Sequence, residues 1–171
     1  MYKILKLLEE KRWLRRTIEM ALFAAVFFGL RAYMQGELVQ GQAPDFQRAT
    51  ILGEEVRFSD YRGKPLLVQF WATWCPICER EQSSIQSIAA DYPVLTVAMQ
   101  SGDAKDILPY LEKRQLTFPV IADADGSLSK QFGVAAVPAS FVLDADGTVR
   151  FVEVGFTTEM GMRLRLWLAG L

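Results

Sequence analysis

A pair of cysteines separated by two residues, placed directly after a short apolar run, constrains the fold of this chain more than any other feature. The run Leu66–Trp71 is almost entirely apolar, which is typical of a strand covered on both faces. Ala-Thr-Trp follows it, and then Cys75-Pro-Ile-Cys78. Beyond Cys78, apolar residues such as Ile85 and Ile88 recur at helical spacing. The motif therefore lies at a junction between a buried strand and a helix.

This position predicts a chemistry for the two sulfur atoms. Cys75 falls in the N-cap region of the helix, where unpaired backbone N–H groups and the helix dipole stabilise a thiolate and lower the pKa of the thiol. Pro76 falls in the first turn, where its missing N–H costs little. Cys78 lies one turn further along the same side, within reach of Cys75. We therefore predict a redox disulfide, with Cys75 as the attacking thiol and Cys78 as the resolving thiol.

Two other interpretations of the pair are a structural disulfide and half of a metal site. A four-residue loop restricts the unfolded chain very little, so a structural bridge here would stabilise the fold only weakly. The chain has two cysteines and no histidine, so the usual further ligands are missing, although its six methionines include candidates for copper(I). We favour the redox interpretation and expect no metal and no cofactor.

Composition excludes several other classes of function. Without histidine the chain cannot carry a Ser-His-Asp triad or a Cys-His pair. Its formal net charge of −1, with no basic patch in the bulk of the sequence, argues against nucleic-acid binding. A peroxidase with a lone reactive cysteine is disfavoured by the paired cysteines.

The N-terminal region differs sharply in charge from the rest. Residues 1–16 carry a net charge of +4, whereas residues 41–171 carry −4. The uncharged run between them, residues 20–30, would extend only about 16 Å, but residues 13–34 would extend about 33 Å if their arginines lie at the interfaces. We therefore predict a basic cytoplasmic segment at 1–12, a single transmembrane anchor at 13–34, a linker at 35–42 and a domain at 43–171 on the far side of the membrane. A cleaved signal peptide and a buried amphipathic helix are the alternatives.

The remaining patterns predict an α/β domain with a central mixed sheet flanked by helices. Strands are expected at 94–99 and 118–122, and helices at 104–114 and 127–132. Asp146-Gly147 predicts a hairpin between 139–143 and 149–154, and a smaller hairpin is expected at 46–50 and 55–58. In the last helix, apolar residues at i, i+4, i+7, i+8 and i+11 predict a stripe facing the core: Met160, Leu164, Trp167, Leu168 and Leu171.

Taken together, residues 43–171 resemble the thioredoxin fold. The run Phe70-Trp-Ala-Thr-Trp-Cys-x-x-Cys resembles that of membrane-anchored TlpA-like thiol-disulfide oxidoreductases, which carry a helix-strand insertion before the second half of the domain. Within that branch the likeness is closest to the suppressor-for-copper-sensitivity D proteins of Gram-negative envelopes, and it extends to the anchor, to residues 96–103 and to residues 161–167.

The resemblance implies further site residues. It implies a cis-proline loop at residues 136–140, in which Pro138 is cis and the backbone of Val137 pairs with an extended substrate segment. Trp74 and Pro76, beside the cysteines, are implied as further substrate contacts. Glu81, three residues after Cys78, is the implied proton acceptor for the resolving thiol, with a pKa raised by desolvation, although a solvated surface glutamate is nearly as good an interpretation. Thioredoxins place a buried aspartate where this chain has Gln69, which cannot titrate.

The resemblance also implies a cellular setting. We expect a single-pass protein of a bacterial inner membrane, with its C-terminal domain in the periplasm. It would reduce disulfides in cysteine-containing envelope proteins and would be re-reduced by an electron donor in the membrane. Two alternatives stay open: a disulfide oxidase or isomerase of the same fold, and a copper-binding module that uses the cysteine pair.

Overall fold

The computed structural model describes residues 13–27, 29 and 38–171, which divide into an N-terminal unit, residues 1–37, and a compact unit, Leu38–Leu171. In the first unit residues 13–27 and 29 are helical, and nearly all of the described side chains there are exposed. Among the helices that the structure describes, none combines the length and the apolar character needed to span a bilayer. The predicted segment 1–12, most of 28–34 and the first part of the predicted linker lie outside the described residues.

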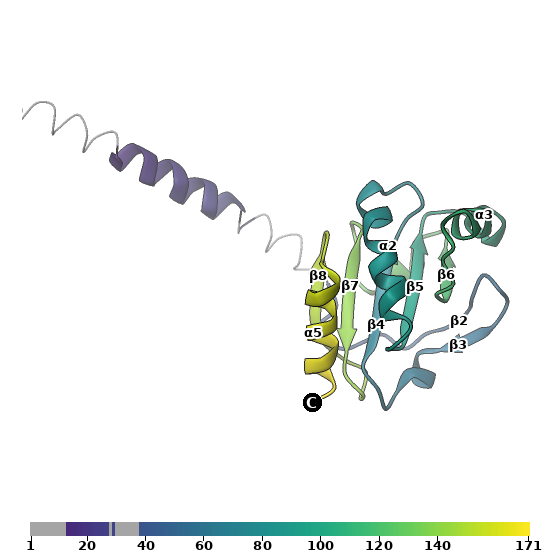
Figure 1. Cartoon of the computed structure of the whole chain (residues 1–171). Helices are drawn as coiled ribbons and strands as arrows, with labels where there is room; N and C mark the ends of the chain where they lie inside the picture. The colour runs from purple at the N-terminus through teal and green to yellow at the C-terminus, as the bar shows by residue number, and fades with distance from the viewer. Residues whose placement is uncertain (1–12, 28, 30–37) are drawn as a thin grey trace, which may run out of the picture. The chain divides into compact units, whose positions relative to one another are not determined.

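A six-stranded mixed sheet forms the centre of the compact unit, in the order β1-β8-β7-β4-β5-β6 (Figure 1). Strand β4 runs parallel to β5, which runs parallel to β6, whereas β7, β8 and β1 add antiparallel pairs on the other side. Its strands are β1 (Gly41–Gln42), β4 (Leu66–Trp71), β5 (Val94–Met99), β6 (Val120–Asp123), β7 (Ala139–Leu143) and β8 (Thr148–Val154). The predicted thioredoxin-like α/β fold with a central mixed sheet is confirmed.

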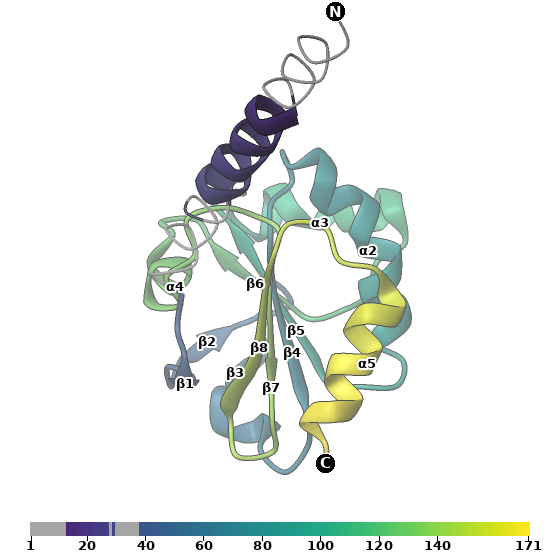
Figure 2. The ribbon, with the colours of Figure 1, turned by 90° about the vertical axis from the view of Figure 1, so that its left-hand side faces the viewer.

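Helices and a small hairpin cover the two faces of this sheet. Figure 2 shows α2, α3 and α5 on one side of the strands, and α4 with the β2–β3 hairpin on the other. These elements are β2 (Gln47–Ala49), β3 (Glu55–Arg57), the 3-10 helix η1 (Phe58–Tyr61), α2 (Pro76–Ile88), α3 (Ala104–Arg114), α4 (Ser127–Gln131) and α5 (Glu159–Ala169).

Strand β4 is central because both of its faces are apolar. Side chains of a strand alternate between the two faces of the sheet. Leu67 and Trp71 pack with the core under α2, α3 and α5. Val68 and Phe70 pack with the core on the opposite face, where Phe132 of the α4 region lies 5.1 Å from Phe70 between ring centroids. All six side chains of β4 are buried, including Gln69.

The element boundaries follow the prediction with small differences. Helix α2 ends at Ile88 instead of continuing to residue 92, because Ala89 is its C-cap and Ala90 and Asp91 form a turn. Strand β6 begins at Val120, two residues later than expected. The compact unit begins at Leu38, which is buried, and β1 pairs with β8, so residues 38–42 of the expected linker lie inside it.

The predicted core stripe of the last helix is wrong. Its five members are between 41% and 86% exposed, and the buried side chains of α5 are instead Met162, Leu166 and Ala169. Both faces of this helix are apolar, so periodicity allows either to turn inward. Two arginines anchor the observed orientation, because Arg163 bonds Asp91 at 2.7 Å and Arg165 bonds Glu153 at 2.6 Å.

Candidate active site

The two cysteines lie where β4 leaves the sheet and α2 begins. The intervening turn is held by the neighbouring loop after β5: the backbone N–H of Thr73 donates to Ser101 Oγ at 3.0 Å, and the indole N–H of Trp74 donates to the carbonyl of Gln100 at 3.1 Å. Gln100 has a φ of 46°, which is uncommon for a residue other than glycine. The turn that presents the motif is therefore fixed from the parallel neighbour strand.

Cys75 is the N-cap residue of α2, as the sequence predicts. Its backbone is extended, Pro76 is the first helical residue, and the backbone N–H of Cys78 donates to Cys75 Sγ at 3.2 Å. A sulfur in this position receives a hydrogen bond and faces the positive end of the helix dipole. Both effects favour the thiolate over the thiol when the cysteine is reduced.

The structure contains a disulfide between Cys75 and Cys78, whose Cα atoms lie 5.3 Å apart. Cys75 is 6% exposed and Cys78 is 1% exposed. Of the two cysteines, Cys75 is therefore the more accessible one.

The loop before β7 lies against this sulfur. The Val137–Pro138 peptide bond is cis, as the resemblance implies. The carbonyl oxygen of Val137 lies 3.6 Å from Cys75 Sγ, and Val137 is partly exposed whereas Pro138 is buried. Of these two residues, Val137 is the one whose backbone lies beside the reactive sulfur.

Glu81 is buried on the inward face of α2, together with Cys78 one turn earlier. It is 1% exposed, so the surface-glutamate alternative is wrong. Its Oε1 accepts a 2.6 Å hydrogen bond from the backbone N–H of Thr157, and its Oε2 accepts a 3.0 Å bond from Gln69 Nε2. Burial raises the pKa of Glu81 above its ordinary value, and the bonds from Thr157 and Gln69 oppose that rise.

Three residues at the site were not found from the sequence. Ser140 lies opposite Gln69 in the β4–β7 pair and bonds its side chain. Thr157 belongs to the segment after β8, in which Gly155 also donates to the carbonyl of Pro138 at 2.8 Å. Phe156 lies between Gly155 and Thr157 in the sequence and is more than half exposed. The β4–β7 register and the path of the segment after β8 bring these three residues to the motif. Local sequence patterns predict neither of them.

Exposed apolar side chains flank the two cysteines in the sequence. Trp74 and Ile77 are about half exposed or more, and Pro76 is exposed between them. Phe156 extends from the segment that bonds Pro138 and Glu81. Trp74, Pro76 and Ile77 thus give the turn around Cys75 an exposed apolar surface.

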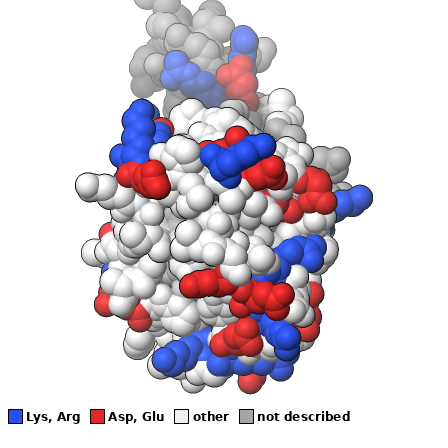
Figure 3. All heavy atoms as spheres, turned by 90° about the vertical axis from the view of Figure 1, so that its right-hand side faces the viewer, with Lys and Arg blue, Asp and Glu red and all other residues white. Residues whose placement is uncertain are grey.

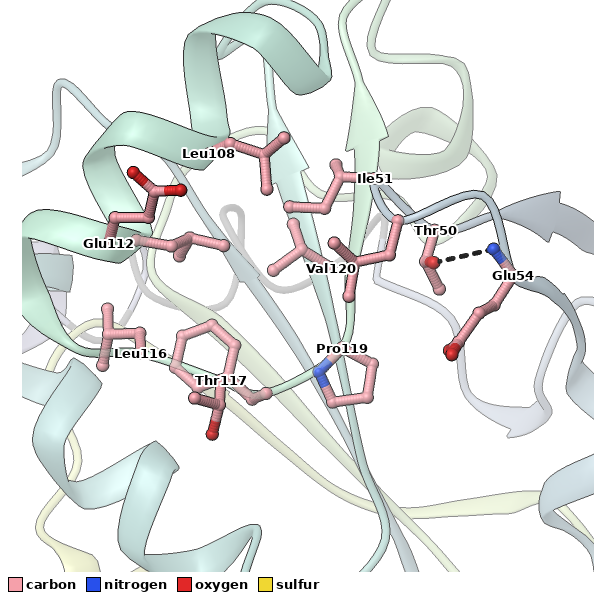
Figure 4. A pocket seen from close by; sticks show the side chains of 12 residues that line it. Thr50, Ile51, Glu54, Leu108, Glu112, Leu116, Thr117, Pro119 and Val120 are labelled. Carbon is pink, nitrogen blue, oxygen red and sulfur yellow. Dashed lines mark hydrogen bonds between the residues drawn. The ribbon is translucent and has the colours of Figure 1, made fainter.

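A separate apolar cleft of about 430 Å³ shares no residue with this site. It lies between α3 and the turn after β2, where Leu108, Ile51 and Val120 converge and Thr50 accepts a hydrogen bond from the backbone of Glu54 (Figure 4). On the side of the domain where α3 and β6 lie, charged side chains border a broad uncharged area (Figure 3). Neither Cys75 nor Cys78 lines this cleft.

The chain is similar in sequence to known proteins. The sequence matches the AhpC/TSA family over residues 39–152. It is 30% identical over 166 residues to the thiol-disulfide oxidoreductase ResA of Geobacillus thermodenitrificans, spanning 92% of this chain and 95% of that protein. It is also 30% identical over 166 residues to the thioredoxin-like protein YneN of Bacillus subtilis, spanning 91% of this chain and 97% of that one.

A solved structure has the same fold. The thiol:disulfide interchange protein of the thioredoxin family from Chlorobium tepidum superimposes with a TM-score of 0.67 at 26% identity. The superposition covers 77% of this chain and 97% of that chain.

Proposed function

The chain belongs to the AhpC/TSA family and is a thiol-disulfide oxidoreductase of the thioredoxin fold, and from this premise we propose that it reduces disulfide bonds in other proteins. One observation carries the proposal. The more accessible sulfur, Cys75 Sγ, is the N-cap of α2 and lies beside the carbonyl of Val137, which an extended substrate backbone would approach.

The reaction begins with the reduced pair. The thiolate of Cys75 attacks one sulfur of a substrate disulfide, a Cys75–substrate bond forms, and the second substrate sulfur leaves as a thiolate. Cys78 then loses its proton, and its thiolate attacks Cys75 Sγ. The mixed disulfide breaks, the substrate leaves as a second thiolate, and the Cys75–Cys78 disulfide forms. The substrate gains two electrons, and a donor dithiol must return two electrons to the enzyme.

Glu81 is the proposed acceptor of the Cys78 proton. The two residues are one turn apart on the buried face of α2, where bulk water cannot take the proton directly. Burial raises the pKa of Glu81, which brings it closer to that of a thiol and makes the carboxylate a better base. The proton moves from the Cys78 sulfur to a Glu81 oxygen, so charge is conserved within the site.

The substrates that fit this surface are proteins with an exposed disulfide next to apolar residues. Trp74, Ile77 and Phe156 would contact such side chains, and the backbone of Val137 would pair with the segment that carries the attacked cysteine. We propose that these substrates are proteins of a bacterial envelope, a setting that the resemblance of the sequence supports.

We also propose that the N-terminal region is a single-pass anchor in the bacterial inner membrane, with the N-terminus in the cytoplasm and the domain in the periplasm. Residues 13–27 extend about 22 Å as a helix, and residues 28–34 are needed to approach the roughly 30 Å of a hydrocarbon core. The charge of +4 on residues 1–16 favours this orientation. The described part of the helix exposes the large apolar side chains Trp13, Leu14, Ile18, Met20, Leu22, Phe23, Val26 and Phe27.

An anchor of this kind suits an electron donor that is itself in the membrane. The finer assignment to the suppressor-for-copper-sensitivity D proteins, and with it a role in copper tolerance, rests on residues 96–103 and 161–167 and stays a prediction.

Trapping of the intermediate tests the function. In Cys78→Ser the second attack is lost, so the reduced full chain should accumulate a mixed disulfide with an oxidised model protein that carries scrambled disulfides, and Cys75→Ser should form none. Equilibration in glutathione buffers should give a potential nearer to about −270 mV than to the roughly −120 mV of a strong oxidant. A potential near the higher of these two values would show that the enzyme oxidises its substrates. If no complex is trapped and copper(I) binding is lost in Cys75→Ser, the chain is a copper-binding module instead.

A further inference from the structure

Behind Glu81 lies a chain of buried hydrogen bonds that crosses two strands. The Oγ of Ser140, on β7, donates to Oε1 of Gln69, on β4. Nε2 of Gln69 donates to Oε2 of Glu81, on α2, at 3.0 Å. Gln69 and Ser140 are directly paired in the antiparallel register, and all three side chains are no more than 2% exposed. The network links the central strands to the helix that carries both cysteines.

The direction of these bonds is set by chemistry. A carboxylate can only accept hydrogen bonds, while an amide carries one acceptor and one donor group. Since the hydroxyl of Ser140 donates to the amide oxygen of Gln69, the NH2 group of Gln69 is left facing Glu81. A rotated amide would place its oxygen against the carboxylate and its NH2 group against the hydroxyl. The carboxylate of Glu81, which only accepts, therefore selects the NH2 end of the amide, and Ser140 supports this orientation by donating to the amide oxygen.

We propose that Gln69 and Ser140 are positioning residues for Glu81: Ser140 supplies the partner of the Gln69 amide oxygen, and Gln69 donates the hydrogen bond that holds the carboxyl of Glu81 in the ionised form that takes the proton from Cys78. The proposal rests on the proposed function, because it assumes that Glu81 is the proton acceptor. It assigns a role to two side chains that do not themselves titrate.

The surroundings of Glu81 make this bond decisive. Strands β4 and β7 contribute the neutral side chains of Gln69 and Ser140, and the segment after β8 contributes the backbone N–H of Thr157. Cys78 is the other titratable group on the buried face of α2. Burial raises the pKa of Glu81, and only the hydrogen bonds from Thr157 and Gln69 oppose it, with no contribution from a charged side chain. Losing the bond from Gln69 removes one of the two opposing effects.

The pKa of Glu81 can be measured directly in the full chain by NMR of carboxyl-labelled glutamate. In Gln69→Leu, which keeps the volume but removes the donor, the pKa should rise by about one unit, a tenfold change in the ionisation equilibrium. In Ser140→Ala the amide oxygen of Gln69 loses its partner, so the amide is held less firmly against Glu81 and the pKa should rise in the same direction by less. Ser129→Ala is the matched control, since Ser129 is an equally buried serine whose hydroxyl bonds Asp123 instead, and it should leave Glu81 unchanged.

Kinetics then test whether the two residues act through Glu81. We expect the pH profile of the rate at which Cys78 resolves a preformed mixed disulfide to shift to higher pH in Gln69→Leu. This shift should vanish when Gln69→Leu is combined with Glu81→Gln. An unchanged Glu81 pKa in both Gln69→Leu and Ser140→Ala would overturn the proposal, as would a kinetic shift that persists in the Glu81→Gln background.

A third outcome separates this proposal from the proposed function. If Glu81→Gln alone leaves the pH profile of resolution unchanged, Glu81 is not the acceptor and the positioning role falls with it. Trapping by Cys78→Ser would still support disulfide exchange in that case. Loss of trapping would instead refute the function itself.

Discussion

Helices α2 and α5 pack on the same face of the sheet and contact each other. They differ in burial, because α2 buries polar side chains whereas α5 exposes large apolar ones. Helix α2 buries a carboxylate and an amide, Glu81 and Gln82, beside Ile85 and Ile88. Helix α5 leaves the large side chains of Leu164 and Trp167 more than half exposed. Burial in this domain is therefore decided by position against the sheet and by available hydrogen-bond partners, and hydropathy alone does not predict it.

The difference has a structural cause. Glu81 can be buried because a backbone N–H and an amide reach both of its oxygens. On α5 the inward positions belong to Met162, Leu166 and Ala169, and Arg163 and Arg165 bind acidic partners beside that face. An apolar stripe on the other side then has no sheet to pack against within the residues 38–171 that the structure describes.

The largest expected effect tests the buried faces of both helices. Ile88→Ala on α2 and Leu166→Ala on α5 each remove a fully buried side chain and leave a cavity. Each should lower the free energy of unfolding by about 2–5 kcal/mol. Urea denaturation followed by circular dichroism measures it. A loss below about 1 kcal/mol at Leu166 would show that α5 turns a different face to the sheet.

A smaller expected effect is a pH dependence of the free energy of unfolding, caused by the buried carboxyl group of Glu81 on α2. Burial raises the pKa of Glu81 above its ordinary value of 4.5 in the folded protein. The stability that Glu81 contributes is thus fully present below about pH 4.5 and is lost as pH rises through the folded pKa. Glu81→Gln does not titrate, so its free energy of unfolding relative to wild type should rise as pH increases over this range.

Unfolding curves of the two proteins at several pH values between 4 and 8 give this difference. A constant offset across the whole range would mean that the hydrogen bonds from Thr157 and Gln69 cancel the effect of burial.

The smallest expected effect is that of Leu164→Ala, which is the matched control for Leu166→Ala. Leu164 differs from Leu166 by two positions on α5 and is 54% exposed, whereas Leu166 is 0% exposed. Leu164→Ala should change the free energy of unfolding by no more than about 0.5 kcal/mol. A loss as large as that of Leu166→Ala, measured in the same urea titration, would restore the predicted core stripe.

The order of elements and the chemistry of the motif could be predicted because both are local. Alternating and helical periodicities located nearly every strand and helix of the domain to within a few residues. The N-cap position of Cys75 follows from an apolar strand, a short turn and a proline in the first helical turn. The cis geometry of Pro138 came from resemblance, since an isolated X-Pro bond favours trans.

The hydrogen-bond network around Glu81 could not be predicted, because its members come from three other parts of the chain: β4, β7 and the segment after β8. Ser140 meets Gln69 only through the antiparallel register of β4 and β7, and Thr157 meets Glu81 across 76 positions of sequence. The inward face of α5 was equally undetermined, since both of its faces are apolar.

The sequence by itself determined that two sulfur atoms would face each other at the start of a helix, because a handful of adjacent residues is enough to end a strand and cap a helix. The tertiary structure decided how the proton of Cys78 can be handled and which apolar surface stays exposed. Those properties depend on strand pairing and on close packing between segments that are distant in the sequence. The hydrogen bonds and packing contacts between such segments form only when the whole domain has assembled.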